Sequence, residues 1–538
     1  MKKIVAMVAA AGFVVGGVLV APTVLAAPKP APAQVAYDPA PIAWGVCEQP
    51  GLARRGAECG MLEVPLDYAA PSGKKIKIAV SRIKAKAPAD QYQGVVLVNP
   101  GGPGGSGVTL SVLGEYVPKD AGLTYDWIGF DPRGVGSSEP SLACDHTYFG
   151  YNRPYYVPVN GQLEKTWLDR SKKYAEACKA AGGDLLDHLK TTDSVNDMDA
   201  LRKALGQEQI NFYGFSYGTY LGQVYATQFP ERVRRMVLDG NVDPRGVWYD
   251  ANIQQDLAFD RNIKIYFDWL AKHDSVYHLG TSGKSIEAKF YLEQQKLRRA
   301  PAGGVIGPDE LTDVFQQAAY YIFGWEDVAN AYAAWMNSGD VSGLKALYDG
   351  ANSQEVGSDN SFAVYLGVQC TDVQWPKSWN RWKVDNWLTF LRAPFLTWGN
   401  AWFNAPCLYW DAKPGKPVKV DGSKAPSILL INETLDAATP YEGALEVRSR
   451  FPKSALIEGV GGTTHSGTLF GNACVDDQIA DYLATGKLPA RVAGRKSDAQ
   501  CEPLPQPTPS AGLARIQGKD TGDGDLTRAE LQKEIGRR

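Results

Sequence analysis

One serine near the middle of the chain lies in a setting that suits a nucleophile. Ser216 stands in the pattern Gly214-Phe215-Ser216-Tyr217-Gly218. The residues before it read as a strand and those after it as a helix, which is the context of the sharp turn that lifts a catalytic serine above a sheet. The glycines leave room where a Cβ would collide. The five-residue pattern alone occurs by chance, but with its context it predicts Ser216 as a nucleophile.

A serine hydroxyl needs a base to take its proton, and the base needs a carboxylate to orient it. In hydrolases with this turn, the acid and then the histidine follow the serine. His465, in a glycine-rich loop after a predicted strand, is the predicted base, since His273 and His278 lie in a helical region. Asp436 follows another predicted strand by a short turn and is the predicted acid, with Glu433 as its rival.

The same chemistry needs backbone N–H groups that stabilise a developing negative oxygen. One should come from Tyr217, the residue after the serine. The other should come from the glycine-rich loop 99–107, where we choose Gly102 as the donor and Gly101 as the second choice. A phosphate-binding loop is the competing interpretation, but the stretch lacks the Gly-Lys-Ser/Thr ending of such loops.

Strands and helices must position these groups, and from Lys75 onward they alternate in the sequence. One helix is predicted with its N-cap at Asp193 or Ser194, and Thr439 with a following proline is predicted to cap another. The alternation indicates a parallel sheet with helices on both faces. It stops at about residue 243 and resumes at about 424, with a Trp- and Tyr-rich helical block between. We predict an α/β-hydrolase fold: a mostly parallel, doubly wound sheet with a large helical cap inserted before the acid-bearing strand.

Length and composition fit an enzyme of more than one domain. The chain has 538 residues, of which 44% are apolar and 21% charged, and its formal net charge is −3. A chain of this length exceeds one compact core, and the charge balance gives no basic field for nucleic acid, so no nucleic-acid partner is expected.

The two ends of the chain differ from the rest. Lys2 and Lys3 precede an apolar run that is too short for a full span and ends in small residues, which is typical of a secretory signal. No later segment is apolar enough to cross a bilayer, so we expect a secreted protein without stable membrane insertion. The predicted divisions are a signal peptide (1–26), a Pro/Ala-rich leader or propeptide (27–43), the first part of the hydrolase core (44–242), the cap (243–423), the second part of the core (424–501), a Pro-rich linker (502–512) and an acidic tail (513–538).

The acidic tail contains a pattern similar to an EF-hand loop and its exit helix. Its oxygen ligands would be Asp520, Asp523, Asp525 and Glu530, which suit Ca²⁺. The loop is one residue short of the full pattern, so weak Ca²⁺ binding and a degenerate acidic tail remain equally open. No other cofactor is expected.

Eight cysteines accompany the predicted export, and an even count in an oxidising compartment indicates disulfides. About 105 pairings are open to eight cysteines. They fall as four sequential couples with modest gaps, so we predict the pairs Cys47–Cys59, Cys144–Cys178, Cys370–Cys407 and Cys474–Cys501.

Several motifs together resemble one family. They are VVLVNPGGPGGSG, DWIGFDPRGVGSSEP, NFYGFSYGTYLGQVYATQFPERVRRMVLDGNVDP, LDAATP and TTHSG, spread between Trp44 and Cys501. The chain resembles the secreted tripeptidyl aminopeptidases of actinobacteria, in the α/β-hydrolase peptidase family that includes prolyl aminopeptidases. The family pattern places the nucleophile at Ser216, the acid at Asp436 and the base at His465. The resemblance implies a serine exopeptidase that releases short peptides, tripeptides by this branch, from substrates with a free N-terminus.

An exopeptidase of this kind needs an anion in the cap to bind the substrate ammonium. Asp372 is the candidate, although a surface cap residue is an equally good interpretation of it, and Asp239 and Asp243 are further options. An esterase or lactone hydrolase with the same triad is the alternative function, because a fold does not fix the substrate. A non-catalytic extracellular binding protein on the same scaffold is the third.

Overall fold

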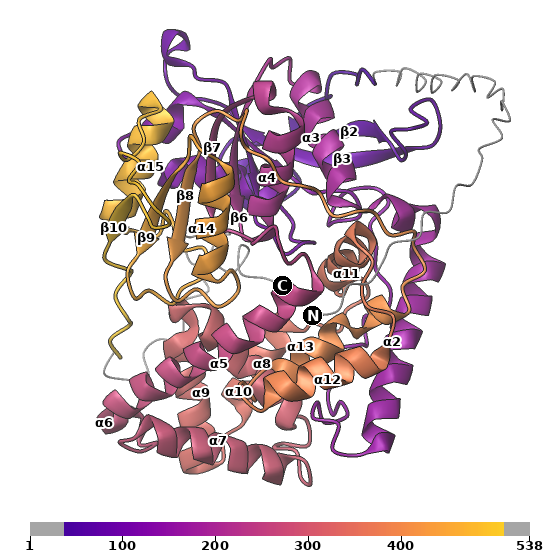
Figure 1. Ribbon diagram of the computed structural model, residues 1–538, viewed down its shortest axis with the longest axis vertical. Helices are drawn as coiled ribbons and strands as arrows, with labels where there is room; N and C mark the ends of the chain where they lie inside the picture. The colour runs from indigo at the N-terminus through magenta and orange to yellow at the C-terminus, as the bar shows by residue number, and fades with distance from the viewer. Residues whose placement is uncertain (1–36, 510–538) are drawn as a thin grey trace, which may run out of the picture. The chain divides into compact units, whose positions relative to one another are not determined.

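A ten-stranded sheet organises residues 37–509, the part of the chain that the computed structural model describes (Figure 1). Its strand order is β1-β2-β3-β5-β4-β6-β7-β8-β9-β10. The strands from β5 through β10 in this order run parallel, whereas β1, β2 and β3 pair antiparallel at one edge. The bounds are β1 Gly45–Val46, β2 Glu58–Pro65, β3 Lys75–Ile83, β4 Val95–Asn99, β5 Asp126–Phe130, β6 Ile210–Phe215, β7 Val233–Asp239, β8 Leu429–Glu433, β9 Ala455–Gly459 and β10 Ala499–Cys501.

The central strands are buried on both faces, which explains their continuous apolar sequences. Along β4, Val95 and Leu97 join one hydrophobic cluster, whereas Val96 and Val98 join the other. Helices cover the two faces. The clusters include residues of α3 Thr191–Ala204, α4 Tyr217–Gln228 and α14 Tyr441–Arg450 on one side, and of the 3₁₀ helix η2 Val108–Tyr116 and α15 Ala473–Thr485 on the other. The short helix α1 Pro50–Arg54 precedes β2.

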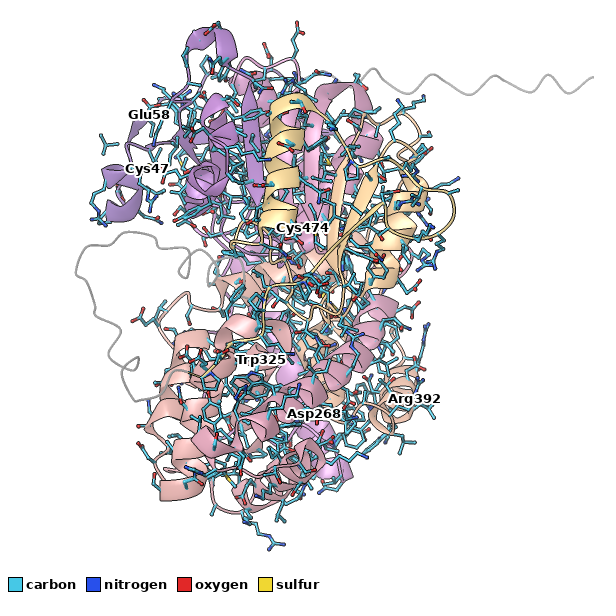
Figure 2. The ribbon with its side chains drawn as sticks, turned by 90° about the vertical axis from the view of Figure 1, so that its left-hand side faces the viewer. Cys47, Glu58, Asp268, Trp325, Arg392 and Cys474 are labelled. Carbon is cyan, nitrogen blue, oxygen red and sulfur yellow. A yellow bond between two sulfur atoms is a disulfide. The ribbon has the colours of Figure 1, made fainter. Side chains whose placement is uncertain are left out.

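A helical cap is inserted between β7 and β8, as predicted. Figure 2 shows Asp268, Trp325 and Arg392 in this half and Cys474 in the half that contains the sheet. Several of its helices share a hydrophobic cluster of their own, separate from the two clusters at the sheet. The cap helices are α5 Tyr249–Lys272, α6 Asp274–Tyr277, α7 Gly283–Leu297, α8 Pro308–Tyr320, α9 Trp325–Ser338, α10 Ser342–Ala351, α11 Asn360–Asp372, α12 Trp379–Phe390 and α13 Thr397–Asn404.

One helix assigned by the sequence to the core packs with the cap. The helix α2 Gly161–Gly182 stands beside α11, α12 and α13 (Figure 1). Asp359, just before α11, accepts hydrogen bonds from the Cys144 N–H at 2.8 Å and from the Tyr174 hydroxyl at 2.8 Å. The indole of Trp402 donates to the Tyr156 carbonyl at 2.7 Å. The segment that precedes α3 therefore serves the cap, which alternating sequence patterns did not indicate.

The four predicted disulfides are all present. Each joins neighbours along the sequence: Cys47–Cys59, Cys144–Cys178, Cys370–Cys407 and Cys474–Cys501. The first ties the segment before α1 to β2, the third closes a loop within the cap, and the fourth fastens β10 to α15. No helix within residues 37–509 has the length and apolar character needed to span a bilayer.

Both boundary segments pack more closely than predicted where they are described. The end of the predicted leader is buried against β2, because Ile42 is 7% exposed and the Tyr37 hydroxyl donates to the Glu63 carbonyl at 2.8 Å. The signal peptide, the start of the leader and the Ca²⁺-binding candidates Asp520, Asp523, Asp525 and Glu530 lie outside the described residues.

The start of the predicted C-terminal linker forms a strap from the core to the cap. Leu504 packs against the hydrophobic cluster of the cap, and the Pro507 carbonyl accepts a hydrogen bond from the indole of Trp269 in α5 at 2.9 Å. The strap follows β10 down to the cap in Figure 1. Residues 502–509 are therefore a tether between the two parts.

The strap should contribute to stability through its one apolar anchor. We expect Leu504→Ala to lower the free energy of unfolding by about 1 kcal/mol, since the side chain is partly buried against apolar residues. Gln506→Ala, at an exposed strap position, is the control and should leave it unchanged. Thermal unfolding of both variants measures this, and equal melting temperatures would show that the Leu504 side chain contributes no stability.

Candidate active site

Ser216 occupies a strained turn between β6 and α4. Its φ of 54° lies in the left-handed region, which costs energy for a residue other than glycine. The turn is held because the Ser216 N–H donates to the Asp239 carbonyl at 2.9 Å. A Cβ at Gly218 would lie 2.7 Å from the Asn99 carbonyl oxygen, so only glycine fits there. This is the nucleophile elbow that the sequence predicts, and Ser216 remains partly exposed at its tip.

The glycine-rich loop lies directly against this turn. A Cβ at Gly101 would lie 2.8 Å from the Ser216 Cβ and 2.9 Å from the Tyr217 nitrogen. The Gly101 N–H is already bonded to Asn99 Oδ1 at 3.0 Å. Within residues 37–509, no hydrogen bond engages the Gly102 N–H. These contacts favour Gly102 over Gly101 as a free donor.

Tyr217 supplies a second free donor for structural reasons. It is the first residue of α4, so its N–H has no partner within the helix. Its side chain is fixed on the other side, where its hydroxyl lies 2.7 Å from Thr191 Oγ1. Together with Gly102, it offers two backbone N–H groups beside Ser216, as an oxyanion hole requires.

His465 and Asp436 meet at the ends of β8 and β9. His465 Nδ1 lies 2.8 Å from Asp436 Oδ2, and both side chains are almost completely buried. Asp436 Oδ1 accepts the N–H groups of Ala438 at 2.9 Å and Thr439 at 3.0 Å. These bonds fix the carboxylate in an orientation that can hold the imidazole ring.

Thr439 also contacts the His465–Asp436 pair, although its place in the sequence predicts a helix cap. It was predicted as a helix cap, but α14 begins only at Tyr441, after Pro440. The Thr439 hydroxyl donates instead to Asp436 Oδ2 at 2.7 Å and lies 3.2 Å from His465 Nδ1. The Asp-Ala-Ala-Thr spacing was visible in the sequence, but only the folded turn shows where the hydroxyl points.

Glu433, the rival acid, does not contact the histidine. Its carboxyl packs against the backbone of the His465 loop, where a Cβ at Gly462 would lie 1.3 Å from Oε2. That oxygen is buried and has no hydrogen-bond partner within residues 37–509. Burial, with smaller contributions from Asp239 and Asp436, raises the pKa of Glu433 to about 8. A group that resists ionisation is a poor partner for an imidazolium, which favours Asp436.

Ser216 and His465 both lie beside residues 239 and 240. The Ser216 N–H bonds the Asp239 carbonyl, and a Cβ at Gly240 would lie 2.9 Å from His465 Cε1. No hydrogen bond joins Ser216 Oγ to His465 Nε2 among the described residues, and Nε2 lies 3.4 Å from the Ser466 hydroxyl. Nucleophile–base hydrogen bonds are often long without substrate and tighten when it binds.

The cap holds the loops that carry the acid and the histidine. In α5, the Asn262 side-chain amide donates to the Leu435 carbonyl at 2.9 Å and to the Thr463 carbonyl at 3.3 Å. At the end of α8, the Tyr320 carbonyl accepts the His465 N–H at 3.0 Å. These contacts fix the backbone of the glycine-rich loop that carries His465 to the cap.

Asp372, the residue predicted to bind the substrate ammonium, accepts hydrogen bonds from other residues of the protein. Its Oδ1 accepts the Thr191 N–H at 2.6 Å, and its Oδ2 accepts the Thr191 hydroxyl at 2.6 Å and the Trp248 indole at 3.1 Å. The carboxylate thus caps α3, which begins at Thr191 rather than after Asp193 or Ser194. Burial raises the pKa of Asp372 to about 6. These contacts describe a brace behind Tyr217 and do not favour a substrate contact.

The two further anchor options are also engaged. Asp239 Oδ2 accepts the N–H and the hydroxyl of Thr468, at 3.0 and 2.7 Å, and burial raises the pKa of Asp239 to about 6. Asp243 pairs with Arg245 at 2.5 Å. Within residues 37–509, no group of three or more His, Cys, Asp or Glu side chains is arranged to hold a metal ion.

Comparisons with known proteins agree with this geometry. Residues 94–280 match the family described as alpha/beta hydrolase fold, and residues 393–501 match the family described as TAP-like protein. The tripeptidyl aminopeptidase of Streptomyces lividans is 38% identical over 482 residues, which cover 87% of this chain and 88% of that protein. The chain belongs to the tripeptidyl aminopeptidase family. The predicted α/β-hydrolase fold and the predicted family are confirmed.

Relatives with lower identity carry names other than tripeptidyl aminopeptidase. The serine protease Hip1 of Mycobacterium tuberculosis is 28% identical and covers 84% of this chain and 90% of its own length. The carboxylesterase B of Mycobacterium tuberculosis is 29% identical and covers 89% of this chain and 95% of its own length. The fold and family are thus settled, whereas the names of the relatives span peptidases and an esterase.

The contacts of the two rival acids lead to a direct test. We expect Asp436→Asn to slow labelling of Ser216 by a fluorophosphonate about 10⁴-fold, because the histidine loses the carboxylate that sets its tautomer. Glu433→Gln is the matched control at the end of the same strand and should label at the rate of the unmodified protein. Slow labelling of Glu433→Gln together with fast labelling of Asp436→Asn would instead identify Glu433 as the acid.

Glu433 should also make stability depend on pH. Its pKa rises from 4.5 to about 8 on folding, so the folded state holds a proton that the unfolded state loses above pH 4.5. The carboxyl therefore destabilises the fold increasingly between about pH 4.5 and pH 8. Glu433→Gln removes this effect, and its stability advantage should grow over that range to a few kcal/mol, at about 1.4 kcal/mol per pKa unit.

Thermal unfolding of both proteins from pH 4.5 to pH 8.5 measures the difference. An advantage that stays constant with pH would show that Glu433 ionises normally in the folded protein.

Proposed function

We propose that this protein is a secreted serine exopeptidase that releases short peptides, tripeptides by family, from substrates with a free N-terminus. The observation that carries the proposal is the buried His465–Asp436 pair, at 2.8 Å, beside an elbow serine and two free backbone donors. The identity to a tripeptidyl aminopeptidase over 87% of the chain supports the choice of substrate. Four disulfides suit an oxidising compartment and support export.

The first half of the reaction forms an acyl-enzyme. His465 Nε2 takes the proton from Ser216 Oγ as the oxygen attacks the scissile carbonyl. Asp436 accepts a hydrogen bond from the Nδ1–H of the ring and stabilises the imidazolium, while the Thr439 hydroxyl donates to the same carboxylate oxygen. The oxyanion is stabilised by the N–H groups of Tyr217 and Gly102, which are aligned before the reaction begins.

Collapse of the tetrahedral intermediate completes the acyl-enzyme, and hydrolysis of the acyl-enzyme follows. The His465 imidazolium protonates the leaving amine, which departs as the shortened peptide. Water then enters, gives a proton to His465 and attacks the acyl carbon. The bond to Ser216 Oγ breaks as His465 returns the proton to that oxygen, and the short N-terminal peptide is released as the acid. Each step uses side chains and backbone groups of this chain.

A second function, hydrolysis of esters or lactones, is supported by one comparison. The same serine, histidine and carboxylate cleave esters as well as amides. The resemblance to a carboxylesterase at 29% identity favours keeping this alternative. What separates the two is a requirement for the free amine, because an exopeptidase must recognise the N-terminal ammonium.

Three substrates test the proposal: an unblocked tripeptide p-nitroanilide, its N-acetylated form, and a p-nitrophenyl ester of a short fatty acid. We expect the unblocked anilide to be cleaved about 100-fold faster, by kcat/KM, than the acetylated one, since a recognised charge is lost on acetylation. Ser216→Ala should fold normally and lose about 10⁶-fold in kcat.

Fast ester hydrolysis with no preference for the free amine would establish the esterase function instead. Undiminished hydrolysis by Ser216→Ala would overturn the assignment of Ser216 as the nucleophile. Failure of a fluorophosphonate to label Ser216, together with no hydrolysis of any of the three substrates, would leave the protein as a binding scaffold.

A further inference from the structure

The cap contains a cavity that the proposed chemistry does not use. Its volume is about 200 Å³, and it lies between α7, the start of α8, residues 155–157, and the end of α12 with the turn into α13. None of the lining residues belongs to the elbow, the glycine-rich loop or the His465–Asp436 pair. Gln295 in its wall is exposed, so the cavity lies at the protein surface.

Three buried polar atoms in the cavity wall have no protein partner. They are Asp309 Oδ2, Tyr291 Oη and Trp398 Nε1, none of which has a hydrogen-bond partner within residues 37–509. Asp309 and Trp398 are each 1% exposed. Leaving a buried polar atom unpaired costs about 1–3 kcal/mol, so three in one cavity indicate that something else satisfies them.

The charges around the cavity lack one cation. Arg153 near the cavity contacts Glu310 at 3.4 Å and Asp313 at 2.7 Å. Arg298, also at the cavity, lies over the Tyr155 ring and donates to Gln295. Within residues 37–509, Asp309 forms no ion pair with either arginine, and its Oδ1 accepts one hydrogen bond, from the Tyr156 N–H at 3.0 Å. Two carboxylates thus share one guanidinium, and Asp309 is a third carboxyl without a partner ion. Burial raises the pKa of Asp309 well above its ordinary value, and a bound cation would reverse that shift.

The rest of the wall also suits a cation. Aromatic residues dominate it: Tyr155, Tyr156, Tyr291, Phe390, Phe395 and Trp398. Aromatic faces attract ammonium groups, and more strongly when water is excluded. We propose that this cavity is a second binding site, in which Asp309 and the surrounding rings hold the ammonium group of a small organic amine.

The remaining polar atoms define the rest of the ligand. The indole N–H of Trp398 only donates and so requires an acceptor, whereas the Tyr291 hydroxyl can donate or accept. An amine with a nearby carbonyl satisfies all three atoms at once. A volume of about 200 Å³ exceeds the roughly 30 Å³ that one water occupies in the liquid, so a group of the size of a single amino-acid residue fits. The class of ligand is therefore an amino-acid amide.

Leucinamide and two analogues test each part of this assignment. In 4-methylpentanamide the amine is missing, and in isopentylamine the carbonyl is missing. Binding is measured by isothermal titration calorimetry at pH 7 with the full-length Ser216→Ala protein, so that the amide is not hydrolysed at the proposed catalytic site. We expect leucinamide to bind at least about tenfold more tightly than either analogue, because each lacks the partner of one buried polar group.

Two variants place the binding in this cavity. Asp309→Asn keeps the Oδ1 acceptor for the Tyr156 N–H and removes the charge, and it should weaken leucinamide binding at least about tenfold. Tyr291→Phe removes only a hydroxyl at a partly buried position and should weaken it severalfold. Glu355→Gln, which removes an exposed carboxylate elsewhere in the cap, is the control and should bind as the parent does.

The outcomes separate the alternatives. No leucinamide binding at 10 mM would show that the cavity holds only water and would overturn the proposal. Equal affinity for leucinamide and 4-methylpentanamide would show that Asp309 acts as a neutral donor, which overturns the cationic ligand. Unchanged binding by both Asp309→Asn and Tyr291→Phe would place leucinamide at another site, such as that of Ser216. None of these results depends on whether the triad cleaves peptides.

Discussion

The left-handed backbone at Ser216 is the constraint on which the site depends. A serine with a φ of 54° persists only because its surroundings hold it. Register places Asn99 of β4 beside Gly214 of β6, which brings the glycine-rich loop onto the turn. The carbonyl at the end of β7 then fixes the Ser216 N–H. Three parallel strands ending at one edge thus deliver the nucleophile and both backbone donors.

The cap is part of this construction and not only a cover. Its first helix, α5, bonds the carbonyls of the loops that carry Asp436 and His465, and α8 accepts the N–H of His465 itself. The strap returns from the core to α5 through Pro507. The helices α5 and α8 thus tie the cap to the loops that carry Asp436 and His465. Movement of the cap and alignment of the histidine ring are therefore coupled.

Buried carboxyls surround this edge, and their surroundings separate their roles. Asp436 accepts three donors besides the histidine, and these bonds fix the orientation of its carboxylate. Glu433 has an oxygen without a protein partner, and burial favours its neutral form. Asp372 is satisfied by Thr191 and Trp248 and braces the elbow from behind. In the cap, Asp309 differs from these three carboxyls, because its unpartnered oxygen belongs to a residue in the wall of a cavity.

The fold class, the insertion point of the cap, the turn at Ser216 and the order of Asp436 and His465 could be predicted from the sequence. The disulfide pairs were predicted from cysteine spacing, and the structure contains them. These depend on local patterns: buried strand runs, glycines at a crowded turn and cysteines close in the chain. Only the tertiary structure decided that α2 belongs with the cap, that Thr439 bonds Asp436 and that Asp372 caps α3. Those contacts join residues from different elements, or they depend on how one turn folds. The residue type alone does not show whether a carboxylate or hydroxyl contacts substrate, a helix end or a cavity.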